Sequence, residues 1–237
     1  MKRAPVSFVI PVHNGAVYLR ESVESALSQT VAPSEVIVVD DGSEDDSAAI
    51  ADSFGYPVRC VRRRHAGQAA ARNHGVSIAS GDFIAFLDAD DIALPPRIER
   101  QLSRFETRPQ LDFCEAYTRN FWSPEISVAD RQIAPREEFT HGDGPKPRLI
   151  ITWLLRRRLF QQLGGFDEQR RFGEDTAWRD RVDDANVVTE AVDEILALRR
   201  LHHNNLTRRH YDQYLSEIVR HTRDRMALVR RKHGQEH

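Results

Sequence analysis

The first hundred residues alternate between short apolar runs and helical segments, which restricts the possible folds more than any other feature. Four runs rich in Val, Ile and Phe have the length of buried strands. They are residues 6–12, 36–39, 58–61 and 83–88. The segments between them show helical spacing of apolar residues or an alanine-rich composition, and Pro95 and Pro96 open a further helix. This order predicts an α/β fold with parallel strands, right-handed crossovers and helices on both faces of the sheet.

Length and composition predict one globular domain. The chain has 237 residues, of which 40% are hydrophobic and 30% are charged. A formal net charge of −2 gives no general attraction to nucleic acid. Two cysteines, Cys60 and Cys114, form no disulfide framework and are expected to be free thiols. Since no apolar run resembles a signal peptide or a membrane span, we expect a cytoplasmic protein.

Polar side chains come after the first two predicted strands. Pro11, His13 and Asn14 come after the first strand, and Asp40 and Asp41 come after the second. Ligands of such sheets bind outside the carboxyl ends of the strands. A carboxylate there can accept a hydrogen bond from a nucleobase N–H, such as N3–H of uracil. The alternative explanation of the second pair is a turn leading into a helix cap.

Three carboxylates stand at the end of the fourth apolar run. In an extended segment residues i and i+2 point to the same side, so Asp88 and Asp90 are predicted to share a face, and Asp91 turns away or caps the next segment. Carboxylate oxygens suit Mg²⁺ or Mn²⁺, which usually also hold a substrate phosphate. We therefore expect one of these cations as cofactor. A solvated polar loop is the alternative.

Six segments, taken together in this order, resemble glycosyltransferase family 2. They are residues 6–15, 27–30, 38–43, 70–75 and 80–91, and residues 163–168 together with 173–175. The resemblance covers about residues 5–205. It implies the GT-A fold, a Rossmann-like, mostly parallel sheet flanked by helices. It also implies inverting transfer of a sugar from a metal-bound nucleoside diphosphate sugar, and a UDP-linked donor is favoured.

The resemblance assigns the nucleoside pocket to the first two strand ends. Pro11 and its neighbour Asn14 would line the pocket, and Asp41 matches the carboxylate that reads the base, with Asp40 beside it. His13 stands where members of the family often carry Tyr. An imidazole can still stack or form a hydrogen bond there, so the pocket is expected to be similar and not identical.

The resemblance assigns the ribose, the diphosphate and the metal to the third acidic strand end. Asp88 and Asp90 match the DxD element, with Asp90 the better metal ligand, and Asp91 is a further acid of the loop. A late Arg-x-x-His segment places His202 where a histidine can reach the diphosphate or complete the metal shell. His203 is the alternative, and an ordinary surface histidine is a third explanation.

The catalytic base is assigned to the acceptor-side motif. An acceptor hydroxyl is a poor nucleophile until a base removes its proton. Asp175 matches the family base, and Glu174 is the alternative base. Both residues precede a predicted helix start, where the helix dipole favours an ionised carboxylate. A structural helix cap is the alternative explanation.

The expected organisation is a single GT-A domain in three parts. Residues 1–115 form the nucleotide-sugar half, residues 116–207 the acceptor-side half, and residues 208–237 a basic C-terminal helix. The acceptor is expected to be a glycan or a lipid-linked molecule. The basic helix either packs on the domain or lies on an anionic membrane, at the inner face.

Two smaller expectations concern the middle of the chain. Residues 122–148 are expected to form an irregular excursion that shapes the acceptor site. Residues 150–155 are expected to be a strand, in which Trp153 packs against a sugar face or, alternatively, in the core.

A second class of function fits the same motifs. A catalytically idle protein that binds nucleotide sugars and serves as a partner subunit would keep the nucleoside pocket. The full set of acids, Asp88, Asp90 and Asp175, favours an enzyme.

Overall fold

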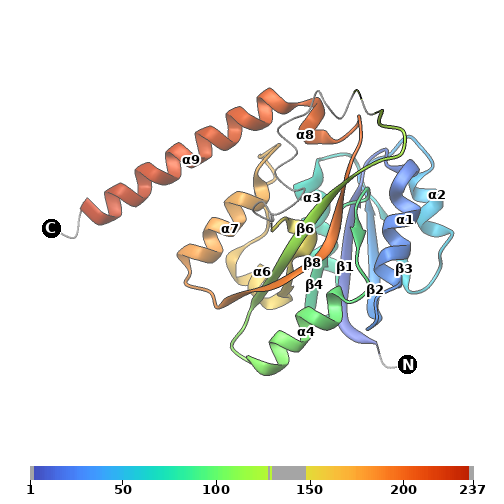
Figure 1. Cartoon of the computed structure of the whole chain (residues 1–237), viewed down its shortest axis with the longest axis horizontal. Coiled ribbons are helices and arrows are strands. Elements are labelled where there is room, and N and C mark those ends of the chain that lie inside the picture. The colour runs from blue at the N-terminus through green and yellow to red at the C-terminus, as the bar shows by residue number, and fades with distance from the viewer. Residues whose placement is uncertain (1–2, 128, 130–147, 235–237) are drawn as a thin grey trace.

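The computed structural model describes residues 3–127, 129 and 148–234 and contains an eight-stranded sheet flanked by helices (Figure 1). The strand order is β3-β2-β1-β4-β7-β6-β8-β5. The strands are β1 (Ala4–Val12), β2 (Pro33–Asp40), β3 (Val58–Arg62), β4 (Phe83–Phe86), β5 (Ile92–Ala93), β6 (Phe113–Trp122), β7 (Leu154–Arg156) and β8 (Thr189–Leu201). The helices are α1 (Ala16–Leu27), α2 (Ser47–Asp52), α3 (Gln68–Ile78), α4 (Arg97–Thr107), η2 (Ile150–Thr152), α6 (Arg157–Leu163), α7 (Glu174–Asp184), α8 (Leu206–Arg209) and α9 (Tyr211–Gly234).

The four predicted strands are confirmed as the parallel half of the sheet. β1 pairs in parallel with β2 and with β4, and β2 pairs in parallel with β3. Their apolar side chains are buried on both faces, as expected for a parallel sheet between helices. α1 and α2 lie on one face and α3 on the other, which is the arrangement that right-handed crossovers require (Figure 1). The carboxyl ends of β1, β2 and β4 therefore meet at one edge.

The second half of the sheet consists of β5, β6, β7 and β8, of which only β7 was predicted, and only in part. β7 pairs antiparallel with β4 and with β6, while β6 runs parallel to β8 along ten residue pairs. The short strand β5 pairs antiparallel with β8 at the sheet edge. Both halves of the chain therefore contribute to one continuous sheet.

The strand expected over residues 150–155 is wrong in its first half. Ile150–Thr152 form a 3₁₀ turn, and the strand begins at Leu154. The Thr152 amide donates to the Leu149 carbonyl at 2.8 Å, and the Trp153 amide donates to the Ile150 carbonyl at 2.9 Å, so these donors are satisfied locally. β6 ends at Trp122, and most of the excursion expected over residues 122–148 lies outside the described residues.

Trp153 packs in the core. It is 3% exposed and lies edge-on to Phe113, with ring centroids 5.1 Å apart. Trp178 packs against it from α7 at 5.6 Å. This aromatic cluster holds α7 against the sheet, which matters because the first turn of α7 carries the predicted base.

Cys60 and Cys114 are free thiols, as predicted. In the described part of the chain, no helix combines the length and the hydropathy that a bilayer span needs. α9 extends beyond α7, away from the sheet (Figure 1). It is held to α7 by the His221 imidazole, 2.8 Å from Asp180, and by Arg225, which pairs with Asp184.

Candidate functional site

A cavity of about 1,910 Å³ opens at the edge where β1, β2 and β4 end. Of the predicted site residues, all except Asp40 line it. The lining residues among them are Pro11, His13, Asn14, Asp41, Asp88, Asp90, Glu174, Asp175 and His202. The structure thus brings residues from both halves of the chain to one cavity.

The loops after β1 and β2 are tied together by Asn14. Its amide donates to Ser43 Oγ at 2.9 Å, and its Oδ1 accepts from the Glu44 amide at 2.8 Å. Asn14 has a φ of +52°, a left-handed conformation that asparagine tolerates. Asp40 completes the turn, because its Oδ1 accepts from the Ser43 amide at 3.0 Å. Asp40 is 3% exposed and lies behind the cavity wall, so its place in the structure is that of a turn residue.

The Asp41 carboxylate organises the loop that comes after β3. It accepts from the amides of Ala66 and Gly67 at 3.1 and 2.7 Å, and Arg63 Nε lies 3.2 Å away. His65 Nδ1 is 2.9 Å from the same carboxylate. Asp41 therefore already has several hydrogen-bond donors, and it positions His65 at the cavity wall.

His65 and His13 form a stacked pair in this region. Their ring centroids are 4.0 Å apart and the rings are inclined by 25°. Both line the cavity, and His13 Nδ1 is also 2.9 Å from the Asp41 carbonyl. No role was predicted for His65; the signal in the sequence was the basic run from Arg62 to Gly67 directly after a strand. A stacked pair leaves the outer face of each ring as a surface against which a base can stack.

A buried ion-pair bridge joins the two halves of the cavity. Arg72 of α3 donates from Nη2 to Asp88 Oδ1 at 2.7 Å and from Nη1 to Glu174 Oε1 at 2.6 Å. Gln68 also donates to Glu174 Oε1, at 2.7 Å. Arg72 and Glu174 are each 2% exposed. No role was predicted for Arg72, although an arginine between Ala69 and Val76 on an alanine-rich helix was a usable signal.

Burial disfavours the charged forms of both Arg72 and Glu174, but the net effect on the two pKa values differs. Burial disfavours the charge of Arg72, but Asp88 and Glu174 outweigh it and raise the Arg72 pKa. Burial raises the pKa of Glu174 to about 7, against the opposing effect of Arg72 and with a further contribution from Asp175. We conclude that Arg72 stays charged. For Glu174, burial disfavours the ionised carboxylate, whereas the pairing with Arg72 favours it.

Asp90 lies beside His202. Its Oδ2 is 2.9 Å from His202 Nε2 and accepts from Asn205 Nδ2 at 3.1 Å. His202 Nδ1 accepts from the Asn204 amide at 3.2 Å, so a neutral His202 carries its proton on Nε2 and donates it to Asp90. In this arrangement His202 Nε2 is directed at the carboxylate of Asp90, and the role of His202 as a metal ligand stays a prediction.

Asp88 and Asp90 both face the cavity, but not for the predicted reason. β4 ends at Phe86, and the acids lie in the turn after it. Asp91 turns inward: it is 3% exposed, and its Oδ1 accepts from the Arg200 amide at 2.8 Å. Burial, together with the charges of Asp90 and Asp88, raises the pKa of Asp91 well above its ordinary value.

The carboxylates suit a hard divalent cation. In residues 3–127, 129 and 148–234, no three His, Cys, Asp or Glu side chains are grouped as a ready-made metal site. Mg²⁺ and Mn²⁺ sites need only one or two carboxylates when a substrate phosphate supplies further oxygens. The second oxygen of Asp88 and of Asp90 has no hydrogen bond from the described residues, so each offers an oxygen to such a cation.

Asp175 occupies the first turn of α7, as predicted. Gly173, with a φ of +70°, lets the chain turn into the helix, and Glu174 begins it. Asp175 Oδ1 accepts from the Thr176 amide at 2.7 Å, and the side chain is half-buried at the cavity wall. Because Glu174 is enclosed in the bridge, Asp175 is the more accessible carboxylate of the pair.

A family model described as glycosyl transferase family 2 matches residues 7–164. The chain belongs to glycosyltransferase family 2. The matched range contains Arg72, Asp88 and Asp90, whereas Asp175 and His202 lie beyond it. The family match therefore covers the proposed donor carboxylates and not the predicted base.

Relatives in this family are longer than the chain. An uncharacterized glycosyltransferase of Rickettsia prowazekii is 33% identical over 178 residues, which are 72% of this chain and 56% of that protein. Uncharacterized glycosyltransferase EpsJ of Bacillus subtilis is 29% identical over 228 residues, which are 90% of this chain and 65% of EpsJ. The chain therefore spans little more than half to two thirds of the length of these relatives.

The fold is that of S. aureus TarS, a GT-A glycosyltransferase. The TarS 1–349 structure in complex with UDP-GlcNAc has a TM-score of 0.62 at 18% identity, covering 84% of this chain and 59% of that one. The TarS structure in complex with UDP has a TM-score of 0.61, also at 18% identity, and covers 90% of this chain and 70% of that one. The predicted α/β GT-A fold is thus confirmed.

Proposed function

We propose that this protein is an inverting, metal-dependent glycosyltransferase that transfers a sugar from a UDP-linked donor to an acceptor hydroxyl. The observation that carries the proposal is that the predicted donor carboxylates, Asp88 and Asp90, and the predicted base, Asp175, line one cavity. They come from opposite halves of the sequence, and Arg72 joins Asp88 to Glu174, the residue before Asp175.

The nucleoside is proposed to bind at the ends of β1 and β2. His13 and His65 offer a stacking surface, and Pro11 contributes the adjoining wall. Asp41 is proposed to accept from the base N–H, as uracil N3 provides, while it holds the loop that carries His65. That TarS binds UDP and UDP-GlcNAc is consistent with a UDP donor for this chain.

The metal is proposed to be Mn²⁺ or Mg²⁺, held by Asp90 with Asp88 and by the donor diphosphate. When bound, such a cation neutralises the negative charge that develops on the leaving diphosphate. His202 and Asn205 hold the Asp90 carboxylate in position through hydrogen bonds to its Oδ2. Arg72 does the same for Asp88 and adds a positive charge near the donor.

Asp175 is proposed to be the catalytic base. It would remove the proton from the acceptor hydroxyl while the oxygen attacks the anomeric carbon from the face opposite the leaving group, which inverts the configuration. Its Oδ1 is occupied by the Thr176 amide, whereas Oδ2 accepts no hydrogen bond from the described residues and is the atom that would take the proton. Glu174 is proposed to position α7 through Arg72.

A screen of UDP-sugars tests this assignment. UDP release, with water or an added acceptor, is measured together with calorimetric UDP binding in the presence of Mn²⁺. We expect Asp175→Asn to lower UDP release by about 10²–10⁴-fold, the usual contribution of a positioned base, and to leave UDP affinity nearly unchanged.

The matched control is Glu174→Gln, one residue away. Loss of release in Glu174→Gln with retention in Asp175→Asn would assign the base to Glu174. A wild-type protein that binds UDP with Mn²⁺ but turns over no donor would instead favour the idle partner subunit.

We also propose that α9 contacts an anionic lipid surface. Three apolar side chains on one side of the helix are exposed: Leu215 at 41%, Val219 at 59% and Met226 at 57%. Residues 220–232 contain six Arg or Lys and one Asp, so two copies of this helix would repel each other. An apolar face beside basic residues is complementary to anionic headgroups over acyl chains. A lipid-linked acceptor would then meet the cavity at the membrane surface.

A further inference from the structure

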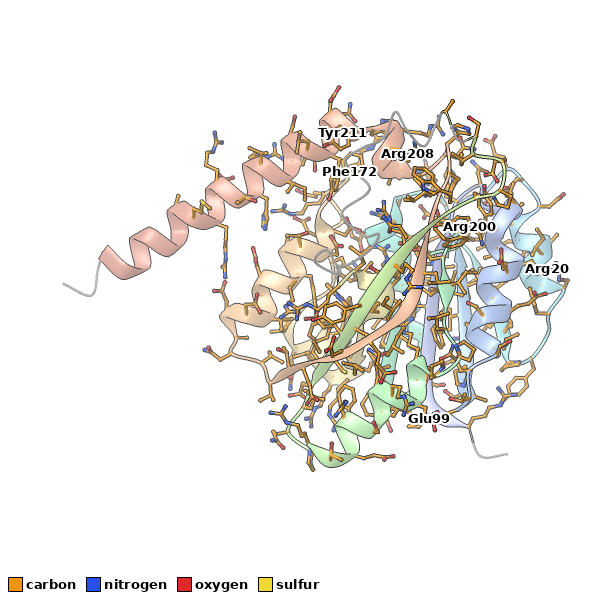
Figure 2. All side chains as sticks on the ribbon, viewed as in Figure 1. Arg20, Glu99, Phe172, Arg200, Arg208 and Tyr211 are labelled. Atoms are coloured by element: carbon orange, nitrogen blue, oxygen red, sulfur yellow. The ribbon has the colours of Figure 1, made fainter. Side chains whose placement is uncertain are left out.

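A basic group lines the cavity on the side where α8 faces the segment before α7. It consists of Arg171, Arg209 and His210, all of which line the cavity. Arg171 Nη2 lies 3.2 Å from His210 Nε2. A guanidinium has no acceptor, so Arg171 donates and His210 accepts. Figure 2 shows the neighbouring side chains Phe172, Arg208 and Tyr211 gathered at this same side of the molecule.

This group differs from several other arginines of the cavity in its lack of counter-charges. Arg72 is paired with Asp88 and Glu174, and Arg148 and Arg179 both pair with Glu115. Arg170 pairs with Asp167.

By contrast, no Asp or Glu oxygen of the described chain lies within 4.0 Å of the guanidinium nitrogens of Arg171 or Arg209. A guanidinium group that has no carboxylate partner among the described residues is suited to an anion, which it can hold through charge-assisted, bidentate hydrogen bonds.

The position of the group favours the acceptor over the donor. Arg171 lies four residues before the proposed base, Asp175, whereas the diphosphate is assigned to Asp88 and Asp90. The cavity, at about 1,910 Å³, exceeds the roughly 300–1,000 Å³ typical of sites for single small ligands. A donor therefore leaves room for an acceptor beside it.

We propose that Arg171, Arg209 and His210 form an anion subsite and that the acceptor carries a phosphate group there. The inference rests on the proposed function, because it assumes that a donor occupies the opposite side of the cavity. Phosphate suits two guanidinium groups, since its oxygens can accept from both at once. The subsite would hold the acceptor phosphate while an acceptor hydroxyl reaches Asp175.

Binding of a short fluorescent polyphosphate chain to protein saturated with UDP and Mn²⁺ tests this subsite. We expect polyphosphate to bind beside UDP, and Arg171→Gln and Arg209→Gln each to weaken it by about tenfold or more, with UDP affinity changed less than about twofold. Arg100→Gln is the matched control, because Arg100 is an exposed arginine of α4, away from the cavity. It should leave polyphosphate affinity unchanged.

Two results would overturn the subsite while leaving the donor site intact. One is a polyphosphate affinity that is the same in both variants as in wild type. The other is a loss of UDP affinity in the variants, together with competition between UDP and polyphosphate, which would assign the arginines to the donor diphosphate. If wild-type protein does not bind UDP with Mn²⁺ at all, it is the proposed donor site that fails, a result distinguishable from both.

Discussion

Arg72→Met tests the buried bridge independently of any substrate. The change keeps a long side chain but removes the charge that faces Glu174 at 2.6 Å and Asp88 at 2.7 Å. Removing one partner of a buried ion pair costs about 3–5 kcal/mol, since the other charge is left buried and unpaired. Asp88 is 32% exposed and can be hydrated, so Glu174, at 2%, accounts for most of this loss.

The pH dependence of the loss has a definite sign. Burial raises the pKa of Glu174 to about 7 even with Arg72 present. Without the Arg72 guanidinium the pKa of Glu174 rises further. A carboxyl whose folded pKa exceeds its unfolded value contributes stability that is fully present below the unfolded pKa of about 4.3 and is lost as the pH rises through the folded pKa. The deficit of Arg72→Met should therefore be largest at pH 8 and smallest near pH 5.

Urea unfolding monitored by tryptophan fluorescence measures the effect, and Arg108→Met is the control. Arg108 pairs with Glu190 at the same 2.7 Å, but its side chain is 46% exposed, so its loss should cost only about 0–1 kcal/mol. The double variant Arg72→Met/Glu174→Gln should recover about half of the deficit at pH 8. A deficit in Arg72→Met below about 1 kcal/mol at pH 8, or one that grows toward pH 5, would refute the assignment of an unpaired buried charge.

Three further predictions concern the cavity and α9. Asp41→Asn should weaken UDP binding without metal by about 1.5–3 kcal/mol, because it removes a charged acceptor and releases the loop that carries His65; an unchanged calorimetric affinity would contradict this. Asp90→Asn should remove most of the difference between UDP affinities with and without Mn²⁺, and equal affinities in wild type would defeat the metal assignment. Wild type should sediment with phosphatidylglycerol vesicles and not with phosphatidylcholine vesicles. The triple variant in which Leu215, Val219 and Met226 are replaced by Ser should no longer sediment with phosphatidylglycerol vesicles. Persistence of binding in this variant would show that this face of α9 is not the contact.

The parallel half of the fold was predictable because each of its strands is a local signal. β1, β2, β3 and β4 are short apolar runs bounded by polar residues, and their order along the chain sets their direction. β6 and β8 gave no such signal. They pair with each other across more than seventy residues, and their sequences carry charged residues such as Glu115 and Arg199 that line the cavity. Only the tertiary partner makes these segments strands.

Asp88 and Asp90, in the loop after β4, face the same cavity, but the backbone geometry from which this was predicted is partly wrong. Asp88 and Asp90 were expected to share a face because of an extended backbone, but the strand stops at Phe86. The two carboxylates are aimed by their partners: Arg72 holds Asp88, and His202 holds Asp90. The acids and His202 were predicted at this site from the sequence, whereas the pairing of Arg72 with Asp88 was not.

The proposed base, Asp175, is positioned by α3 more than by the sequence around it. Arg72 donates a hydrogen bond to Glu174 in the first turn of α7. The next residue of α3, Asn73, forms hydrogen bonds with the segment that precedes α7. Asn73 Oδ1 accepts from the Phe166 amide at 2.8 Å, and its Nδ2 donates to the Phe166 carbonyl at 2.9 Å. A Cβ at Gly165 would lie 2.5 Å from Asn73 Oδ1, so this approach requires glycine.

Two adjacent side chains of one helix thus fix both the start of α7 and the glycine segment that leads to it. Asp88, one of the proposed donor carboxylates, is bound to the same Arg72. The distance between Asp88 and the proposed base is therefore set by side chains of the first half of the chain, acting across a buried contact. A change in α3 should alter acceptor chemistry even where it touches no acceptor, because it moves Asp175 relative to Asp88.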